Sequence, residues 1–524
     1  MWRNFGLYPR NPAPFMSLDP VKFPPTQAWT PLNAKEWSLE NARHLLHRIG
    51  FSATPDRVQL AFTQGLQATL HQAFGMVRVL PEPESFSAEM QPRVELRNQL
   101  RAGAAAPTGD VTSQALQKRQ INQQLAQLDR QAFLDYVQQW LAFAAVPENS
   151  AQENLVMFLS NVLVVGQNKV KDPLRLFGHT DLLRRTFQQP YPDICKAVTY
   201  SPAMIQYLDL NTNAVGVANE NYAREVMELF TLGIGNYTEN DIKEAARART
   251  GIVIRPEQGG ELGTVAPARW DSKPKTIFGQ TGNWNAEDVI DLIFEQPGAR
   301  TLLPRRFCAY FLSEDPLPAP YLEELGRQWQ NARWRVDELA RLVFSSSLFF
   351  QPEFRLAQVK NPTQYYLGLC QDLNLDVSPF DGQAFNTLRA MGQEPFNPPN
   401  VRGWLGGKNW INSSTLAARR QLVQQLFSPV NERALTADLQ MKLQAARAAG
   451  HGAIAMDNTR LQALADKSDD DLADSLLDFF LAGETTTAYR ADILDYLKND
   501  QAARIELVRD VAVALFQSPA YHLC

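Results

Sequence analysis

The chain of 524 residues is long enough to bury a large core, and its 45% hydrophobic and 20% charged residues are typical of a folded globular protein. Its 51 basic and 56 acidic side chains give a formal charge of −5, so no overall positive field attracts nucleic acid, and we expect no nucleic-acid partner. No long apolar stretch is free of charges, which excludes a membrane-spanning helix.

The N-terminal segment, residues 1–35, is rich in prolines and charges, and we expect an irregular arm there. A signal peptide needs an uninterrupted apolar stretch, which this arm lacks, so we expect a cytoplasmic protein. The cysteines are far apart and form no C-x-x-C pair, so we expect neither a disulfide framework nor a cysteine zinc site.

Helical patterns begin after this arm. Ser38 is placed to cap a helix that ends near Gly50. His44 and His47 lie three residues apart on the polar side of this helix and could hold one metal ion, but an H-x-x-H pair alone is weak evidence. Hydrogen-bonded structural roles are more common for such histidines.

The rest of the chain predicts a mainly α-helical protein. Residues 85–145 have helical spacing on both sides of a break at 103–110, which predicts a helical hairpin inserted into a helical core of residues 36–427. Only residues 251–265 combine β-branched residues with a glycine-rich turn, which is typical of one small β-hairpin. The C-terminal part, 428–524, is again helical and should pack on the core.

A charged segment, "NENYAREVMELFTLGIGNYTENDIKEAARARTG" (219–251), lies near the middle of the chain. At roughly 100° per residue, a helix over 220–232 places Glu225 and Glu228 in one stripe that leads to Leu232. Because that stripe runs into apolar residues, both glutamates should be partly buried. A buried carboxylate must be paired, protonated or bound to a metal ion.

The same segment also has a structural interpretation. Glu220, Arg224 and Glu228 are spaced for ion pairs along an exposed helix face. Thr238 and Asp241 are placed to cap the next helix. Under this interpretation the charges stabilise two helices and form no site.

Segment 219–251 resembles the central segment of a bacterial family, numbered as domain of unknown function 1800, in which N-E-N-[FY]-A-R-E-[LV]-x-E-L-F-T-L-G precedes Y-T-E-x-D and A-R-x-x-T-G. Other similar segments follow the family's order, among them "ARHLLHRIGFSATPDRV" (42–58), "KTIFGQTGNW" (275–284) and "NPPNVRGWLGGKNWINSSTLAAR" (397–419). The resemblance covers about residues 40–523 and identifies the chain as a member, which implies little about activity.

The chain departs from the family in two places. Where similar proteins commonly have F-W-H-N-H-F, this chain has "FLSNVL" (158–163), and where they have H-D-x-G-x-K it has "WDSKPK" (270–275). Three histidines are therefore missing. If these imidazoles bind a metal ion or transfer protons in relatives, this protein lacks them, although Asp271 and the glutamates remain.

The loop at 397–413 contains Trp404 and Trp410 among several glycines. Their flat rings could stack on a sugar ring or an aromatic partner. Alternatively, both rings are buried plugs that pack the loop onto the helices.

The same loop leads into a helix that begins near residue 414. Asn412 or Ser413 can cap this helix, which leaves backbone N–H groups beside Arg402 and Lys408 for an anion or carboxylate.

Two functions remain open. The first is a binding or assembly protein that holds a protein partner or a polymeric ligand such as a glycan, and the missing histidines favour it. The second is a metal-assisted hydrolase or transferase in which Glu220, Glu225, Glu228 and Asp271 bind a divalent cation beside an anionic or glycan substrate. The candidate ligand-binding residues are Asn219, Glu220, Asn221, Arg224, Glu225, Glu228, Asp271, Lys275, Arg402, Trp404, Lys408, Trp410 and Asn412.

Overall fold

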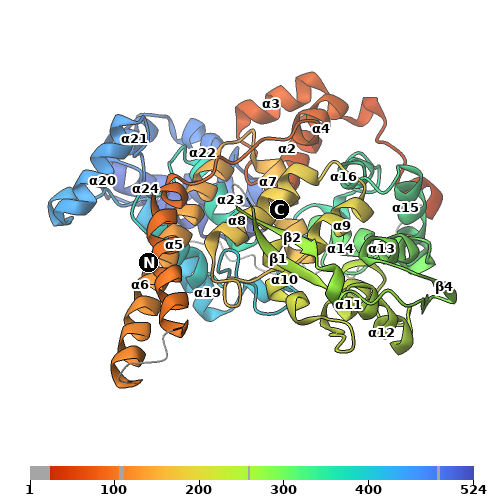
Figure 1. Ribbon diagram of the computed structural model, residues 1–524. Coiled ribbons are helices and arrows are strands. Elements are labelled where there is room, and N and C mark those ends of the chain that lie inside the picture. The colour runs from red at the N-terminus through yellow and green to blue at the C-terminus, as the bar shows by residue number, and fades with distance from the viewer. Residues whose placement is uncertain (1–23, 106–110, 258–259, 481–483) are drawn as a thin grey trace.

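The computed structural model describes residues 24–105, 111–257, 260–480 and 484–524. These residues form a body of packed helices with two small antiparallel β-hairpins (Figure 1). The predicted mainly α-helical fold is therefore confirmed. Most of the predicted arm, residues 106–110 of the predicted break at 103–110, and residues 258–259 and 481–483 lie outside the described residues, whereas residues 103–105 belong to a helix.

The first described elements cover one edge of the body. They are α1 (Pro25–Ala28), α2 (Leu39–Ile49), α3 (Pro55–Gln64) and α4 (Leu66–Phe74). Ser38 caps α2 as predicted, because its side chain accepts a hydrogen bond from the Asn41 N–H. Trp29 is buried and donates its ring N–H to the Tyr321 carbonyl at 2.8 Å, so this part of the predicted arm packs against the body.

The predicted polar position of the two histidines on α2 is wrong. His44 and His47 are both buried, because neighbouring elements cover nearly all of α2. The His44 ring stacks on Phe349 at 4.5 Å between centroids, and its Nε2 lies 3.1 Å from the Phe349 carbonyl oxygen. His44 therefore has the hydrogen-bonded structural role.

The predicted helical hairpin is present as α5 (Glu84–Ala105) and α6 (Val111–Ala145), which projects from the body at the lower left of Figure 1. Arg93 joins its two helices through a hydrogen bond of 2.9 Å from Nε to Asp129. The last turns of α6 enter the body, where Trp140 is buried.

The centre of the body contains short helices. They are α7 (Ser150–Val162), α8 (Pro173–Thr186), α9 (Tyr191–Thr199), α10 (Pro202–Tyr207), α11 (Asn221–Glu225), a π-helix (Val226–Thr231) and α12 (Glu239–Ala248). The capping box that was predicted at the start of α12, formed by Thr238 and Asp241, is confirmed.

Two hairpins follow α12. The predicted one pairs β1 (Ile252–Glu257) with β2 (Gly260–Val265), from Ile252 opposite Val265 to Glu257 opposite Gly260. A second, which the sequence did not predict, pairs β3 (Lys275–Ile277) with β4 (Gln280–Gly282).

Helices complete the chain. They are α13 (Ala286–Phe294), α14 (Leu302–Phe311), α15 (Ala319–Asn331), α16 (Val336–Phe344), α17 (Pro362–Asp372), α18 (Gln383–Ala390), α19 (Ser413–Leu426), α20 (Ala437–Ala448), α21 (Asn458–Ala465), α22 (Asp469–Leu477), α23 (Glu484–Asn499) and α24 (Arg504–Phe516). The C-terminal helices contact the earlier ones directly, since the Tyr365 hydroxyl donates to the Phe516 carbonyl at 3.0 Å.

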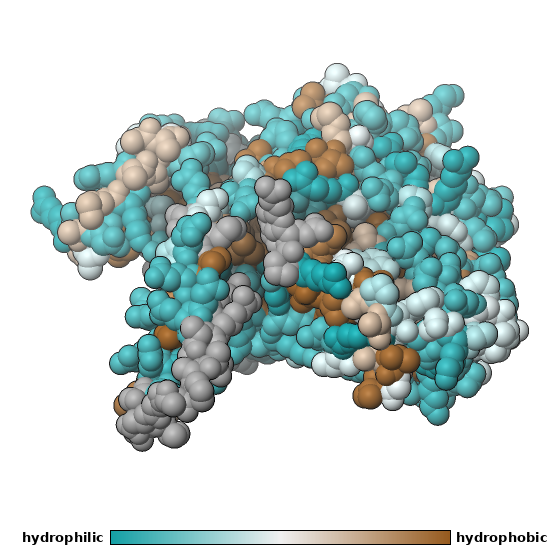
Figure 2. Space-filling model, viewed as in Figure 1, coloured by the Kyte–Doolittle hydropathy of each residue, from teal (hydrophilic) through white to brown (hydrophobic). Residues whose placement is uncertain are grey.

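One cluster of buried hydrophobic residues runs from α1 to the C-terminal segment. The four cysteines are free and buried. The face shown in Figure 2 is mostly hydrophilic, with hydrophobic residues gathered mainly near its centre. Among the residues that the structure describes, no helix combines the length and the apolar character that crossing a bilayer requires.

Candidate functional site

A cavity of about 230 Å³ lies between α7, α8, α14 and the loop that contains the two tryptophans. We call residues 397–413 the tryptophan loop. Aromatic and aliphatic side chains form much of the cavity wall, and amide and hydroxyl groups lie between them. The aromatic side chains in the wall are those of Trp140, Phe158, Tyr310, Phe396, Trp404 and Trp410.

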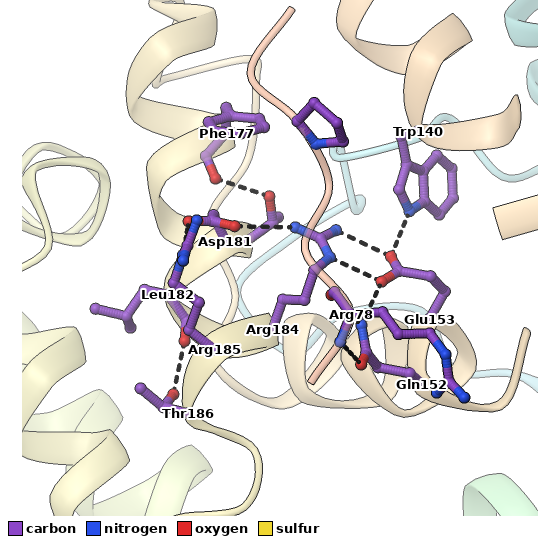
Figure 3. A network of polar contacts seen from close by, with 12 residues as sticks. Arg78, Trp140, Gln152, Glu153, Phe177, Asp181, Leu182, Arg184, Arg185 and Thr186 are labelled. Carbon is purple, nitrogen blue, oxygen red and sulfur yellow. Dashed lines mark hydrogen bonds and ion pairs between the residues drawn. The ribbon is translucent and has the colours of Figure 1, made fainter. Parts of the chain in front are cut away.

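The buried part of the wall, which we call the back wall, includes Arg184. Arg184 forms an ion pair with Glu153, which does not itself line the cavity (Figure 3). Arg184 on α8 donates from Nε and Nη2 to the two carboxylate oxygens of Glu153 on α7, at 2.7 and 2.9 Å. Both side chains are fully buried. Trp140 points its ring N–H at the same carboxylate, at 3.0 Å (Figure 3). The charges of Arg184 and Glu153 neutralise each other, and both carboxylate oxygens already accept hydrogen bonds from Arg184 or Trp140. The pair therefore stabilises the wall and offers no free carboxylate to a ligand.

The pKa values of the back wall agree with this arrangement. Burial disfavours the charged form of Arg184, but the contact with Glu153 outweighs burial and raises the pKa of the guanidinium. His179, also in the wall, has its pKa lowered to about 4 by burial. Its Nε2 lies 2.9 Å from the Leu163 carbonyl, and a carbonyl only accepts, so Nε2 carries the proton of a neutral ring.

The rim of the cavity is fixed by Asn161 at the end of α7. Its side-chain oxygen accepts from the Trp404 N–H at 2.7 Å, and its side-chain nitrogen donates to the Trp404 carbonyl at 3.1 Å. The neighbouring Gly403 has φ +80°, and a Cβ there would lie 2.2 Å from the Asn161 side-chain oxygen. Glycine is thus required both for the backbone conformation and for the close approach.

Arg306 on α14 joins the rim to two other segments. Its Nη1 donates to the Leu229 carbonyl of the π-helix at 3.0 Å, and its Nη2 donates to the Asn161 and Arg402 carbonyls at 2.9 and 3.1 Å. Burial lowers the pKa of the Arg306 guanidinium. The sequence analysis did not select this residue.

The charged segment meets the tryptophan loop at this rim. Arg402 Nη2 lies 3.7 Å from Glu228 Oε1, and the Tyr237 hydroxyl donates to the other Glu228 oxygen at 3.2 Å. Glu225 is half-buried, as predicted, and burial together with the charge of Glu228 raises its pKa. Two of the predicted site segments therefore lie side by side.

The helix that carries these glutamates differs from the predicted one. It is an α-helix only to Glu225 and continues as the π-helix, in which the Leu232 N–H donates to the Met227 carbonyl, five residues back, at 2.9 Å. Turns of this kind are rare and are often found at functional sites. Leu232 is buried, as the stripe suggested.

The two tryptophans of the loop have different positions. Trp410 is buried, which fits the packing interpretation. Trp404 is half-buried and forms part of the cavity wall, where its ring is available to a ligand. Asn412 caps α19 as predicted, and its side chain accepts from the N–H groups of Ser414 and Thr415, so these two N–H groups are not free for an anion.

The backbone beside Trp410 is held by an acid from another segment. The Lys408 N–H donates to Glu314 Oε2 at 3.1 Å, and the Val359 N–H donates to Glu314 Oε1 at 3.2 Å. The Lys408 side chain is exposed.

Asp271 and Lys275 lie in a different group. Asp271 accepts from Arg247 Nε at 2.8 Å, and this hydrogen bond lowers its pKa. Lys275 is buried and donates to the carbonyls of Asp271 and Lys273 at 2.6 and 3.0 Å. These contacts stabilise the turn before β3 and do not bring Asp271 to the glutamates.

The remaining candidates stabilise the start of α11. Arg224 pairs with Glu220 at 3.3 Å and with Glu239 at 2.7 Å, which fits the structural interpretation in part. Asn219 accepts from the Asn221 N–H at 3.0 Å and donates to Thr212 at 3.1 Å.

In the described part of the chain, the acidic side chains do not form the cluster that the metal-assisted hydrolase or transferase requires. Within residues 24–105, 111–257, 260–480 and 484–524, no group of three or more histidine, cysteine, aspartate or glutamate side chains is placed to hold a metal ion. Glu225 and Glu228 are neighbours, whereas Asp271 is bonded to Arg247. The three carboxylates do not converge.

A comparison with family models matches residues 44–523 to a family described as "Protein of unknown function (DUF1800)". The chain belongs to the DUF1800 family. No curated protein and no solved structure matches it. The DUF1800 match covers nearly the whole chain and agrees with the resemblance seen in the sequence.

One of the two places where this chain departs from similar DUF1800 sequences lies in the cavity wall. Ser160, Asn161 and Val162 occupy the positions of the H-N-H motif, and all three line the cavity. Glu153, Arg184 and Arg306 were not among the candidates predicted from the sequence. Gln152 and Asn154 flank Glu153, and each arginine stands in an Arg-Arg pair, so no local pattern marks them.

Proposed function

We propose that this protein binds a small organic ligand, or the end of a polymeric one, in the cavity beneath the tryptophan loop. The observation that carries this proposal is the composition of the cavity wall, which combines aromatic rings with amide and hydroxyl groups. A concave, mainly apolar site with a few polar groups is typical of ligand pockets. Rings contribute contact area, and the amides of Gln364 and Gln393 can form directional hydrogen bonds.

The rim of the cavity is pre-organised. Asn161, Arg306 and Glu314 each hold backbone groups of the tryptophan loop from a different part of the chain. A ligand that enters such a site does not have to order the loop first, so less free energy is spent on binding.

The outer face of the loop supports contact with something larger than the cavity. Leu405 is 83% exposed and is the direct neighbour of Trp404. An exposed leucine at the mouth suits the continuing part of a polymeric ligand or the surface of a partner protein.

A metal-assisted hydrolase or transferase is the alternative. This alternative needs carboxylates that converge on one cation. Glu228 instead contacts Arg402 and Tyr237, and Asp271 contacts Arg247. No observation among the described residues favours this alternative over the binding function.

The proposal is tested by closing the mouth of the cavity. Ala309 is exposed at the mouth, so Ala309→Trp should block entry, whereas Ala309→Ser should leave it open. We expect ligand-observed NMR with fragment-sized organic molecules to find binders of the unmodified protein and of the serine variant that no longer bind the tryptophan variant. Fragments that bind all three proteins equally, or a lack of binders, would contradict the proposal.

A further inference from the structure

The arginines around the cavity differ in what neutralises them. Arg184 has the carboxylate of Glu153 at 2.7 Å, and Arg402 lies 3.7 Å from that of Glu228. Arg306 contacts three backbone carbonyls and, among the described residues, no carboxylate. A carbonyl is a dipole without net charge, so the positive charge of Arg306 is solvated but remains uncompensated.

Arg306 also retains hydrogen-bonding capacity. A guanidinium has five N–H donors, and the three carbonyl contacts use three of them. The Nε–H and one Nη–H have no partner in the described part of the chain. Because Arg306 lines the cavity, a bound molecule can reach this cation.

The rest of the wall does not supply the missing negative charge. Among the described residues that line the cavity, none is an aspartate or a glutamate. Among the described residues, Tyr191, a phenol, is the one group that counteracts the effect of burial on the pKa of Arg306. Buried charges in proteins are normally paired, which makes a lone cation beside an open volume unusual.

Contacts with carbonyls alone do not define a site. Arg48 donates to the carbonyls of Phe311, Leu312, Phe354 and Cys524, and it is fully buried in the packed core. A ligand cannot reach it there. Arg306 differs from Arg48 in two ways, since it lines the cavity and lacks the electrostatic attraction that Cys524 exerts on Arg48.

We propose that the ligand of this cavity carries an oxyanion, either a carboxylate or a phosphate, held by Arg306 while its apolar part lies against the aromatic wall. The inference rests on the proposed binding function and specifies the chemistry of the ligand. Charge-assisted hydrogen bonds from a guanidinium to an oxyanion are among the stronger polar contacts in proteins. Trp404, whose backbone is held by Asn161, lines the same cavity as Arg306.

The test compares matched probes that differ in charge. The probes are 3-phenylpropionate, phenyl phosphate and the neutral 3-phenylpropanamide, together with acid and amide pairs built on any fragment that binds. Binding is followed by the fluorescence of the tryptophans, of which Trp140, Trp404 and Trp410 line the cavity. We expect at least one anion to bind about tenfold more tightly than its amide at low ionic strength, and salt to reduce the preference.

Variants of adjacent arginines identify the cation. Arg306→Gln should remove the preference for the anion, and because it also removes contacts that hold the rim, the acid and its amide should bind with equal but lower affinity. Arg305→Gln removes the same charge from an exposed position one residue away on α14, and it should retain the preference. If Arg306→Gln does not fold, the comparison of acids and amides on the unmodified protein still tests whether the cavity prefers an oxyanion.

The possible failures can be separated. If fragments bind in the cavity but acids show no advantage over amides, or if Arg306→Gln retains the advantage, the inference about the oxyanion is wrong and the binding function stands. If no fragment responds to Ala309→Trp, the proposed function itself is wrong, and the inference that rests on it is wrong too.

Discussion

On the back wall of the cavity a fully buried carboxylate holds Arg184, whereas on the rim three backbone carbonyls hold Arg306. The first arrangement is complete in itself, because donor and acceptor charges cancel. The second fixes the side chain in place but leaves its charge for another molecule. Position in a cavity therefore does not decide the role of an arginine, and its partners must be known as well.

The largest expected effect is on the back wall. Glu153→Gln should lower the free energy of unfolding by about 3 kcal/mol, because it leaves the buried Arg184 with only the more distant carboxylate of Asp181, at 3.7 Å. Urea unfolding measures this change. Arg185→Gln, which alters the neighbouring and exposed arginine of α8, is the matched control and should change stability little. A small effect of Glu153→Gln would mean that the pair is not a structural unit.

The neutral state of His179 gives the back wall a pH dependence. Between its folded pKa of about 4 and the ordinary value of 6.5, the unfolded chain binds a proton that the folded chain does not. Stability therefore falls as the pH falls through this window, by about 3 kcal/mol in total for this group. His179→Gln should flatten this part of the stability curve. Parallel curves for the two proteins would show that His179 is protonated in the folded state.

The rim can be tested at two glycines. Gly403→Ala places a methyl group 2.2 Å from the Asn161 side-chain oxygen, whereas Gly406→Ala meets no atom within 4 Å. Both glycines have positive φ, so an alanine at either position strains the backbone and lowers the free energy of unfolding. Gly403→Ala should lower it by about 2 kcal/mol more than Gly406→Ala, because of the additional clash. Thermal unfolding measures the difference, and Gly403→Ala should also shift the fluorescence of Trp404. Equal losses would show that Asn161 does not hold the loop.

The smallest expected effect is at Glu225, whose pKa is raised by burial and by Glu228. A carboxyl group with a raised folded pKa destabilises the fold when it is charged, so Glu225→Gln should be slightly stabilising at pH 7. The gain should fade as the pH falls to the range where the carboxyl group is protonated. We expect less than about 1 kcal/mol, because the side chain is half-exposed and screened by water. Glu220→Gln, which removes a partner of Arg224, should show no such gain.

Features that depend on near neighbours were predictable from the sequence. The caps at Ser38, at Thr238 with Asp241, and at Asn412 need only a few consecutive residues, and all three are confirmed. The partial burial of Glu225 also followed from the local pattern, because the stripe runs to the apolar Leu232.

Features that depend on distant segments were not predictable in this way. Glu153 and Arg184 are on different helices, and Arg306 contacts residues that are 77, 96 and 145 positions away in the chain. A single sequence does not show that these segments meet. The π-helix was missed for another reason, since a fixed turn of roughly 100° per residue assumes α geometry throughout.

The wide turn at Val226–Thr231 has a consequence for chain length. Its hydrogen bonds span five residues in place of four, so it accommodates roughly one residue more than an ordinary turn. Removal of a single residue from this turn would let the helix tighten to α geometry without breaking it. Everything on its N-terminal side, including Glu225, would then rotate by roughly 100° against Arg402 and Arg306. The alignment of the acidic stripe with the cavity rim therefore depends on one extra residue.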